Sequence, residues 1–200
     1  MPEVESSPLL ADVTRFVLRT AAAEMSVHMP TRPFRIAVNI APRDLERRGF
    51  VTEVLAVNAT LPEGVSLVLE LTERFLLSKS PRVTQIFETL RARGIRFAID
   101  DFGTQHSNLD LLNRFPFDFV KIDRQFVSQV DTGGVELIRG IVSVARHFGL
   151  LVITEGVETE AQHQALRDAD VPFSQGYLYQ RPVAANELPE KPVPTLYAHS

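Results

Sequence analysis

The sequence predicts an α/β fold in which a parallel sheet is covered by helices. Six short apolar runs alternate along the chain with segments in which apolar residues recur at helical spacing. Gly94 and Gly149 each follow a helical segment, at the position where a left-handed glycine commonly ends a helix. This alternation is typical of parallel sheets, and it fits a doubly wound sheet and a (β/α) barrel equally well.

The elements follow from the two periodicities. In the first helix, Leu10, Val13 and Val17 recur at helical spacing, whereas the strands are short and continuously apolar. The predicted helices cover residues 9–25, 45–57, 81–93, 108–114, 135–148 and 160–169. The predicted strands cover residues 35–39, 65–71, 96–100, 119–122, 151–155 and 173–175. The sequence therefore divides into an α/β domain over residues 1–182 and a proline-rich tail over 183–200, which we expect to be extended or disordered.

Composition narrows the function classes. A net charge of −4 argues against a broad basic face for DNA or RNA, so neither is an expected partner. The chain has no cysteine, which excludes thiolate zinc sites and cysteine nucleophiles. No stretch resembles a signal peptide or a bilayer span, and we expect a cytoplasmic protein. The histidines are scattered and are expected on the surface or in loops: His28, His106, His147, His163 and His199.

Polar residues end nearly every predicted strand. They are Asn39, Glu70, Asp100 with the adjacent Asp101, Asp123 and Glu155. A single acidic residue at a strand end is commonly a turn former or a helix N-cap. Five strands ending this way favour a functional reading, because the carboxyl ends of barrel strands converge on the mouth that holds the active site.

These side chains form an oxygen-ligand set that suits Mg²⁺ or Mn²⁺ and not zinc or iron. Two neighbouring carboxylates such as Asp100 and Asp101 repel each other unless a positive group lies between them, and bound cations would remove that cost. The layout fits two-metal phosphoester hydrolysis. Lys121 fits a fixed positive charge beside the attacking water, and its alternative role is a salt bridge to Asp123.

Several motifs also resemble those of a known family. They are VNIA (38–41), LELTE (69–73), DDFGT (100–104), FVKID (119–123), EGVE (155–158) and QGYLYQRP (175–182). In this order they resemble the EAL-domain cyclic di-GMP phosphodiesterases. The resemblance implies a TIM-like (β/α) barrel with one antiparallel strand, and Mg²⁺- or Mn²⁺-dependent hydrolysis of cyclic di-GMP to linear pGpG. It also implies a homodimer and an upstream sensory domain or protein partner.

The resemblance assigns roles to individual residues. The implied metal ligands are Asn39, Glu70, Asp100, Asp101 and Glu155, with Asp100 bridging the two ions. The implied catalytic residues are Lys121, Glu155 and Asp101, and the implied substrate-binding residues are Asp123 and Gln175. Glu73 and Glu158 resemble residues of loops that couple the metal site to the dimer interface or support a neighbouring segment.

The sequence also departs from the family pattern. It contains no Glu-Ala-Leu motif, which in the family lies on the first barrel strand and supplies a metal ligand, so we expect a barrel that is incomplete at its N-terminal strand. Gln105 stands where the family usually has glycine, and Ala41 where it has serine. The alternatives left open are a non-catalytic module that binds cyclic di-GMP or docks on a protein, and a barrel enzyme acting on another phosphoester or anionic substrate.

Overall fold

The computed structural model describes residues 9–27, 33–72, 81–104, 109–130 and 133–188. These residues fall into two compact units. The first unit runs to Phe97 and includes Arg114–Pro116, and the second holds Ala98–Asn113 and the chain from Phe117 onward. Among the described segments, no helix is long and apolar enough to cross a membrane.

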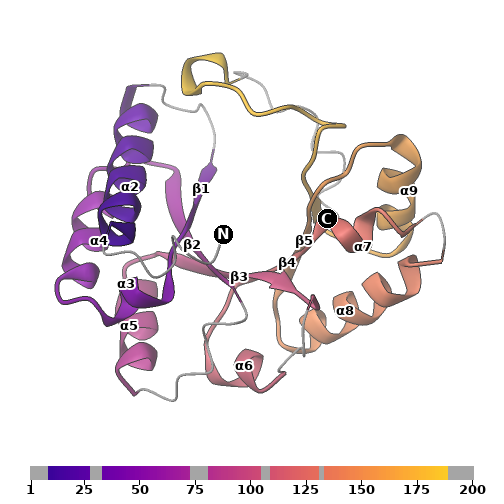
Figure 1. Ribbon diagram of the computed structural model, residues 1–200, viewed down its shortest axis with the longest axis horizontal. Helices are drawn as coiled ribbons and strands as arrows, with labels where there is room; N and C mark the ends of the chain where they lie inside the picture. The colour runs from indigo at the N-terminus through magenta and orange to yellow at the C-terminus, as the bar shows by residue number, and fades with distance from the viewer. Residues whose placement is uncertain (1–8, 28–32, 73–80, 105–108, 131–132, 189–200) are drawn as a thin grey trace. The chain divides into compact units, whose positions relative to one another are not determined.

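The first unit pairs two parallel strands and covers them with helices. Its elements are α2 (Leu10–Val27), β1 (Phe34–Asn39), α3 (Pro42–Glu46), α4 (Phe50–Asn58), β2 (Val65–Thr72) and α5 (Pro81–Arg91). The β1–β2 register runs from Phe34 opposite Val65 to Asn39 opposite Glu70. Helix α2 packs against α4 and β1, and these helices lie side by side in Figure 1. The register therefore brings the two polar strand ends of this unit together.

The core of the first unit is aromatic. Phe87, on the apolar face predicted for α5, stacks on Phe97 with ring centroids 4.0 Å apart. Phe115 closes the cluster at 5.1 Å from Phe87. All three rings are almost fully buried, and aromatic groups of this size contribute most to core stability.

One predicted helix is wrong. In place of one helix over residues 45–57 there are two, α3 and α4, because the chain leaves the helical conformation at Arg47 and Gly49 takes the left-handed φ of 86°. A side chain disfavours that conformation, and glycine adopts it freely. The other predicted helices and strands exist, with ends that differ by one or two residues.

The second unit is a run of four parallel strands. Its elements are β3 (Arg96–Phe102, of which Arg96 and Phe97 belong to the first unit), α6 (Leu109–Arg114, of which Arg114 does), β4 (Phe119–Ile122), α7 (Arg124–Val127), α8 (Val135–His147), β5 (Leu151–Thr154), α9 (Glu160–Asp168), β6 (Phe173–Ser174) and the 3₁₀ helix η3 (Ala185–Glu187). Strands β3 to β6 pair in chain order. Helix α8 packs on β5 and against α7 and α9 (Figure 1). The parallel α/β prediction is confirmed.

Two short helices were not predicted. Helix α7 directly follows the strand motif FVKID, and Asp123 caps it. Helix η3 lies in the predicted tail, so the described part of the tail includes one short 3₁₀ helix. Residues 189–200 lie outside the described residues.

Candidate functional site

Strand β3 carries its two adjacent carboxylates in a β-bulge. Ile99 pairs with Val120 and Phe102 pairs with Ile122, so three steps along β3 match two steps along β4. The extra residue falls at Asp100 and Asp101, and Asp101 has a left-handed φ of 55°. In a regular strand these neighbours would point to opposite faces, whereas two residues of a bulge oppose one residue of the partner strand. Here that residue is Lys121, which lies between Val120 and Ile122.

Lys121 holds two carboxylates together. Its Nζ lies 3.2 Å from Asp100 Oδ1 and 2.6 Å from Glu155 Oε1, and the side chain is almost fully buried. Strand β4 is buried along its whole length, which fixes the ammonium against β3 on one side and the end of β5 on the other. A buried ammonium between two carboxylates is well placed to stabilise a negatively charged group that enters the site.

Asp123 has a different partner. Its Oδ1 accepts a hydrogen bond from the Gln125 N–H at 2.8 Å, which makes it the N-cap of α7. The negative charge of Asp123 also acts on the cluster, because it raises the pKa of Asp101. The capping role that a single strand-end carboxylate suggests is therefore present at this position.

The ends of β5 and β6 bring Glu155 and Gln175 into contact. Gln175 Nε2 donates to Glu155 Oε1 at 2.8 Å, and the Gln175 N–H donates to the Thr154 carbonyl at the same distance. The Glu155 N–H donates to the Ile122 carbonyl at 3.0 Å. Gly156 follows with a φ of 72°, and a Cβ there would collide with the side chain of Arg124. The backbone thus fixes where Glu155 stands.

The cluster is short of positive charge. Burial raises the pKa of Asp101, the charges of Asp100, Asp123 and Glu155 raise it further, and Lys121 opposes them. Among the described groups that act on this pKa, three are carboxylates and one is an ammonium. A divalent cation would relieve this repulsion.

A groove of about 680 Å³ lies beside the cluster in the second unit. Its walls include Asp123, Glu155, Gln175, Tyr177, Arg181 and Pro182. The Arg181 guanidinium lies 4.5 Å from the centre of the Tyr177 ring. A volume of this size suits a small-molecule ligand, and a planar cation over an exposed ring offers a surface for stacking.

The first unit contributes Asn39 and Glu70. Asn39 ends β1 and stands opposite Glu70, which lies two residues before the end of β2, and the Ile40 N–H donates to the Glu70 carbonyl at 2.9 Å. Glu70 is buried and Asn39 is exposed. The register therefore brings one carboxylate and one amide oxygen to the same strand edge.

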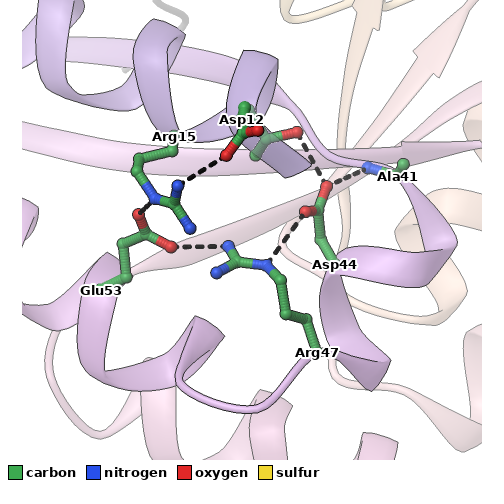
Figure 2. Close-up of polar contacts among 7 residues, drawn as sticks. Asp12, Arg15, Ala41, Asp44, Arg47 and Glu53 are labelled. Carbon is green, nitrogen blue, oxygen red and sulfur yellow. Dashed lines mark hydrogen bonds and ion pairs between the residues drawn. The ribbon is translucent and has the colours of Figure 1, made fainter. Parts of the chain in front are cut away.

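Asp44 anchors the segment that follows Asn39. Its Oδ2 accepts from the Thr14 hydroxyl at 2.8 Å and from the Ala41 N–H at 3.0 Å (Figure 2). Asp44 is 1 % exposed, so both bonds are shielded from water. They connect helix α2 to the turn that follows β1, directly after Asn39.

An ion-pair network continues from Asp44 between α2, α3 and α4. Glu53 Oε2 accepts from Arg47 Nη2 at 2.6 Å and its Oε1 from Arg15 Nε at 2.5 Å (Figure 2). Burial alone would raise the pKa of Glu53, but the hydrogen bonds and charges of Arg47 and Arg15 outweigh it, and its pKa lies below the ordinary value. This network supports the scaffold of the first unit.

The donor chemistry fits hard divalent cations. Every predicted ligand offers carboxylate or amide oxygen, the atoms that Mg²⁺ and Mn²⁺ prefer. Within the described ranges, no three acidic or histidine side chains already enclose a common point suited to a metal ion. The predicted ligands form two groups, Asn39 with Glu70 in the first unit and Asp100, Asp101 and Glu155 in the second.

Two predicted loop residues remain to be placed. Glu73 lies outside the described residues. Glu158 is exposed, and its N–H donates to Gln162 Oε1 at 2.8 Å at the start of α9. Sequence reasoning missed two buried polar side chains, Thr154 and His163. Strand alternation, which places Thr154 and Glu155 on opposite faces, was the signal that could have found Thr154.

Comparison with known proteins identifies relatives. The sequence matches the EAL domain family over residues 1–182. It is 39% identical over 193 residues to the cyclic di-GMP phosphodiesterase PdeL of Escherichia coli K12, covering 94% of this chain and 53% of that protein. The chain thus spans about half the length of this relative, and 36% of the probable cyclic di-GMP phosphodiesterase PdeN of the same organism.

Solved structures agree with the sequence match. The crystal structure of the EAL domain of Mycobacterium smegmatis DcpA matches with a TM-score of 0.81 and 33% identity, over 90% of this chain and 83% of that one. The PaMucR phosphodiesterase in complex with c-di-GMP matches with a TM-score of 0.83 and 32% identity, over 94% and 78%. The predicted EAL-type (β/α) barrel fold and the resemblance read from the motifs are both confirmed.

Proposed function

Since the chain belongs to the EAL domain family, we propose that it is a metal-dependent phosphodiesterase that hydrolyses cyclic di-GMP to linear pGpG. The observation that carries the proposal is the buried Lys121 ammonium between Asp100 and Glu155, beside a groove large enough for a nucleotide. Cyclic di-GMP phosphodiesterases among its relatives, such as PdeL, support the choice of substrate.

The chain's own residues supply charge and orientation. Lys121 donates hydrogen bonds to the oxygens that gain negative charge when the phosphodiester is attacked. Glu155 accepts from Lys121 and Gln175, which leaves its second oxygen, Oε2, to face a water or a cation. Asp101, whose pKa is raised, completes the predicted catalytic set.

We propose Mg²⁺ or Mn²⁺ as the cofactor. Asn39, Glu70, Asp100, Asp101 and Glu155 are the residues that would hold two ions. Bound there, the ions would polarise the phosphoryl oxygens and lower the pKa of the attacking water. The excess of carboxylate over ammonium around Asp101 supports this assignment.

The groove is the proposed substrate site. Tyr177 and Arg181 offer a surface on which a guanine base can stack, and Asp123 and Gln175 line the same groove with groups that can bond its edge. We propose that Glu73 and Glu158 belong to regulatory loops, that the protein acts in the cytoplasm as a homodimer, and that a sensory domain or protein partner controls it.

Chromatography of cyclic di-GMP incubated with the purified chain tests the proposal. We expect pGpG to appear with Mg²⁺ or Mn²⁺ and not with EDTA, and Glu155→Gln to abolish it. Glu136→Gln, on the exposed face of α8, is the matched control and should leave turnover unchanged. Intact substrate under every condition, with retained binding of cyclic di-GMP, would instead identify a non-catalytic binding module.

A further inference from the structure

Four polar side chains form a continuous chain behind the ends of β5 and β6. Thr154 Oγ1 lies 2.8 Å from Ser174 Oγ, and the Ser174 hydroxyl also hydrogen-bonds the Tyr179 phenol. His163 Nδ1 lies 2.8 Å from the Tyr179 oxygen, with the two rings edge to face. We call these residues the hydroxyl–imidazole chain. It joins the last residue of β5 to the middle of α9.

Two members of the hydroxyl–imidazole chain are buried, and Ser174 and Tyr179 are half-buried. Thr154 is 0 % exposed and His163 is 5 % exposed. The prediction that His163 is a surface or loop residue is therefore wrong. Burial also raises the pKa of Tyr179, which keeps its phenol a neutral hydroxyl that can both donate and accept. Buried polar groups cost free energy unless they find partners, so the hydrogen bonds among these side chains favour one arrangement of the elements that carry them.

The elements that it fixes are those of the candidate site. Thr154 and Ser174 are register partners, and each is followed directly by a site residue, Glu155 and Gln175 respectively. Successive residues of a strand point to opposite faces, so the hydroxyl–imidazole chain lies on one side and the Glu155–Gln175 contact on the other. Strand β6 is only two residues long, and its ladder alone gives little control of register.

We propose that the hydroxyl–imidazole chain is a positioning network that sets the Gln175 carboxamide against Glu155 and so orients the carboxylate that pairs with Lys121. Among the described residues, the lining of the groove includes none of these four, so they act through the strand ends. The inference rests on the proposed function for its effect on turnover. The geometry of Gln175 can be measured without turnover.

Isosteric variants separate positioning from packing. Thr154→Val keeps the shape of the side chain and removes the hydroxyl, whereas Thr154→Ser keeps the hydroxyl; Tyr179→Phe removes the phenol oxygen alone. Ser128→Ala is the control, because it deletes a hydroxyl that donates to the Gln125 carbonyl on α7, outside the network. Each protein is measured for kcat and KM with cyclic di-GMP, and for the ¹H–¹⁵N signals of the Gln175 side-chain amide, which Gln175→Glu identifies by their loss.

We expect Thr154→Val and Tyr179→Phe to shift the Gln175 amide signals and to lower kcat about tenfold with little change in KM, since small misplacements of catalytic groups act on kcat. Thr154→Ser and Ser128→Ala should match the parent chain. Unshifted Gln175 signals in both hydroxyl-deletion variants would overturn the inference, even if they unfold at lower temperature. A parent chain without turnover whose variants still shift Gln175 would refute the proposed function and support the positioning network.

Discussion

The Lys121 ammonium and the Gln175 carboxamide donate to the same oxygen of Glu155, at 2.6 Å and 2.8 Å. One oxygen of this carboxylate is therefore held by two donors from neighbouring strand ends. The arrangement fixes the orientation of the carboxyl plane and leaves Oε2 for an incoming group.

Replacing Lys121 by methionine tests the role of its charge. Methionine fills a similar volume without charge, so we expect kcat to fall about 100-fold or more, as when a charge-stabilising donor is removed from an active site. Steady-state kinetics with cyclic di-GMP measures the loss. Circular dichroism serves as the control, and a chain that folds normally and retains full activity would contradict the role given to Lys121.

Two substitutions of Asp123 separate its two roles. Asparagine can still cap α7, and alanine cannot, so we expect Asp123→Ala alone to lose about 1 kcal/mol of stability. If the carboxylate also binds substrate, both variants should raise KM for cyclic di-GMP about tenfold. Thermal unfolding and kinetics together decide. Parent-like KM in Asp123→Asn would leave capping as its function.

Gly156 is expected to tolerate no side chain. Gly156→Ala combines a positive φ with a collision against Arg124, and it should destabilise the protein by roughly 2 kcal/mol while displacing Glu155. Gly140 on α8 is the matched control, because a Cβ there meets nothing within 4 Å. Gly140→Ala should stabilise by about 0.5–1 kcal/mol, since alanine favours the helix. Denaturant titration compares the two.

Glu53→Gln should change how stability depends on pH. The folded-state pKa of Glu53 is lowered, so its contribution is present above the unfolded value, near 4.5, and is lost as the pH falls through the folded pKa. We expect the variant to be less stable by about 1–2 kcal/mol at pH 7 and to approach the parent in acid. Urea unfolding at pH 7, 5 and 3 measures the difference. A constant difference across this range would contradict the ion-pair account.

Strand positions and the polar strand ends could be predicted because they depend on local sequence patterns. Residues 119–122 form a strand at the predicted bounds, and Lys121 lies at the centre of the cluster in the second unit. Apolar runs that end in charged residues carry this information directly, and parallel pairing then brings the ends together.

The remaining details depend on backbone geometry and tertiary partners. The bulge at Asp101 requires a positive φ in a residue other than glycine. The spacing of apolar residues in the sequence does not predict such a conformation. The sequence around His163 predicts a surface histidine. Its partner, Tyr179, lies 16 residues away in the sequence and is brought beside it by the turn that follows β6. The sequence shows a glycine at position 49, where the predicted helix is broken. Glycine also occurs inside helices, so its presence alone did not predict the break.

Because of the bulge in β3, the number of residues between Ile99 and Phe102 matters as well as their identity. Between Ile99 and Phe102 the strand holds two residues where β4 holds one, so both carboxylates stand opposite Lys121 in the register only at this length. A deletion of either aspartate would return β3 to regular pairing and leave a single carboxylate opposite Lys121, with Phe102 still in its place. A substitution at Asp100 or Asp101 changes one functional group, whereas a deletion changes the number of groups that the strand can present. Related sequences that share this architecture should therefore tolerate replacement at these positions more readily than any change in the spacing between the flanking apolar residues.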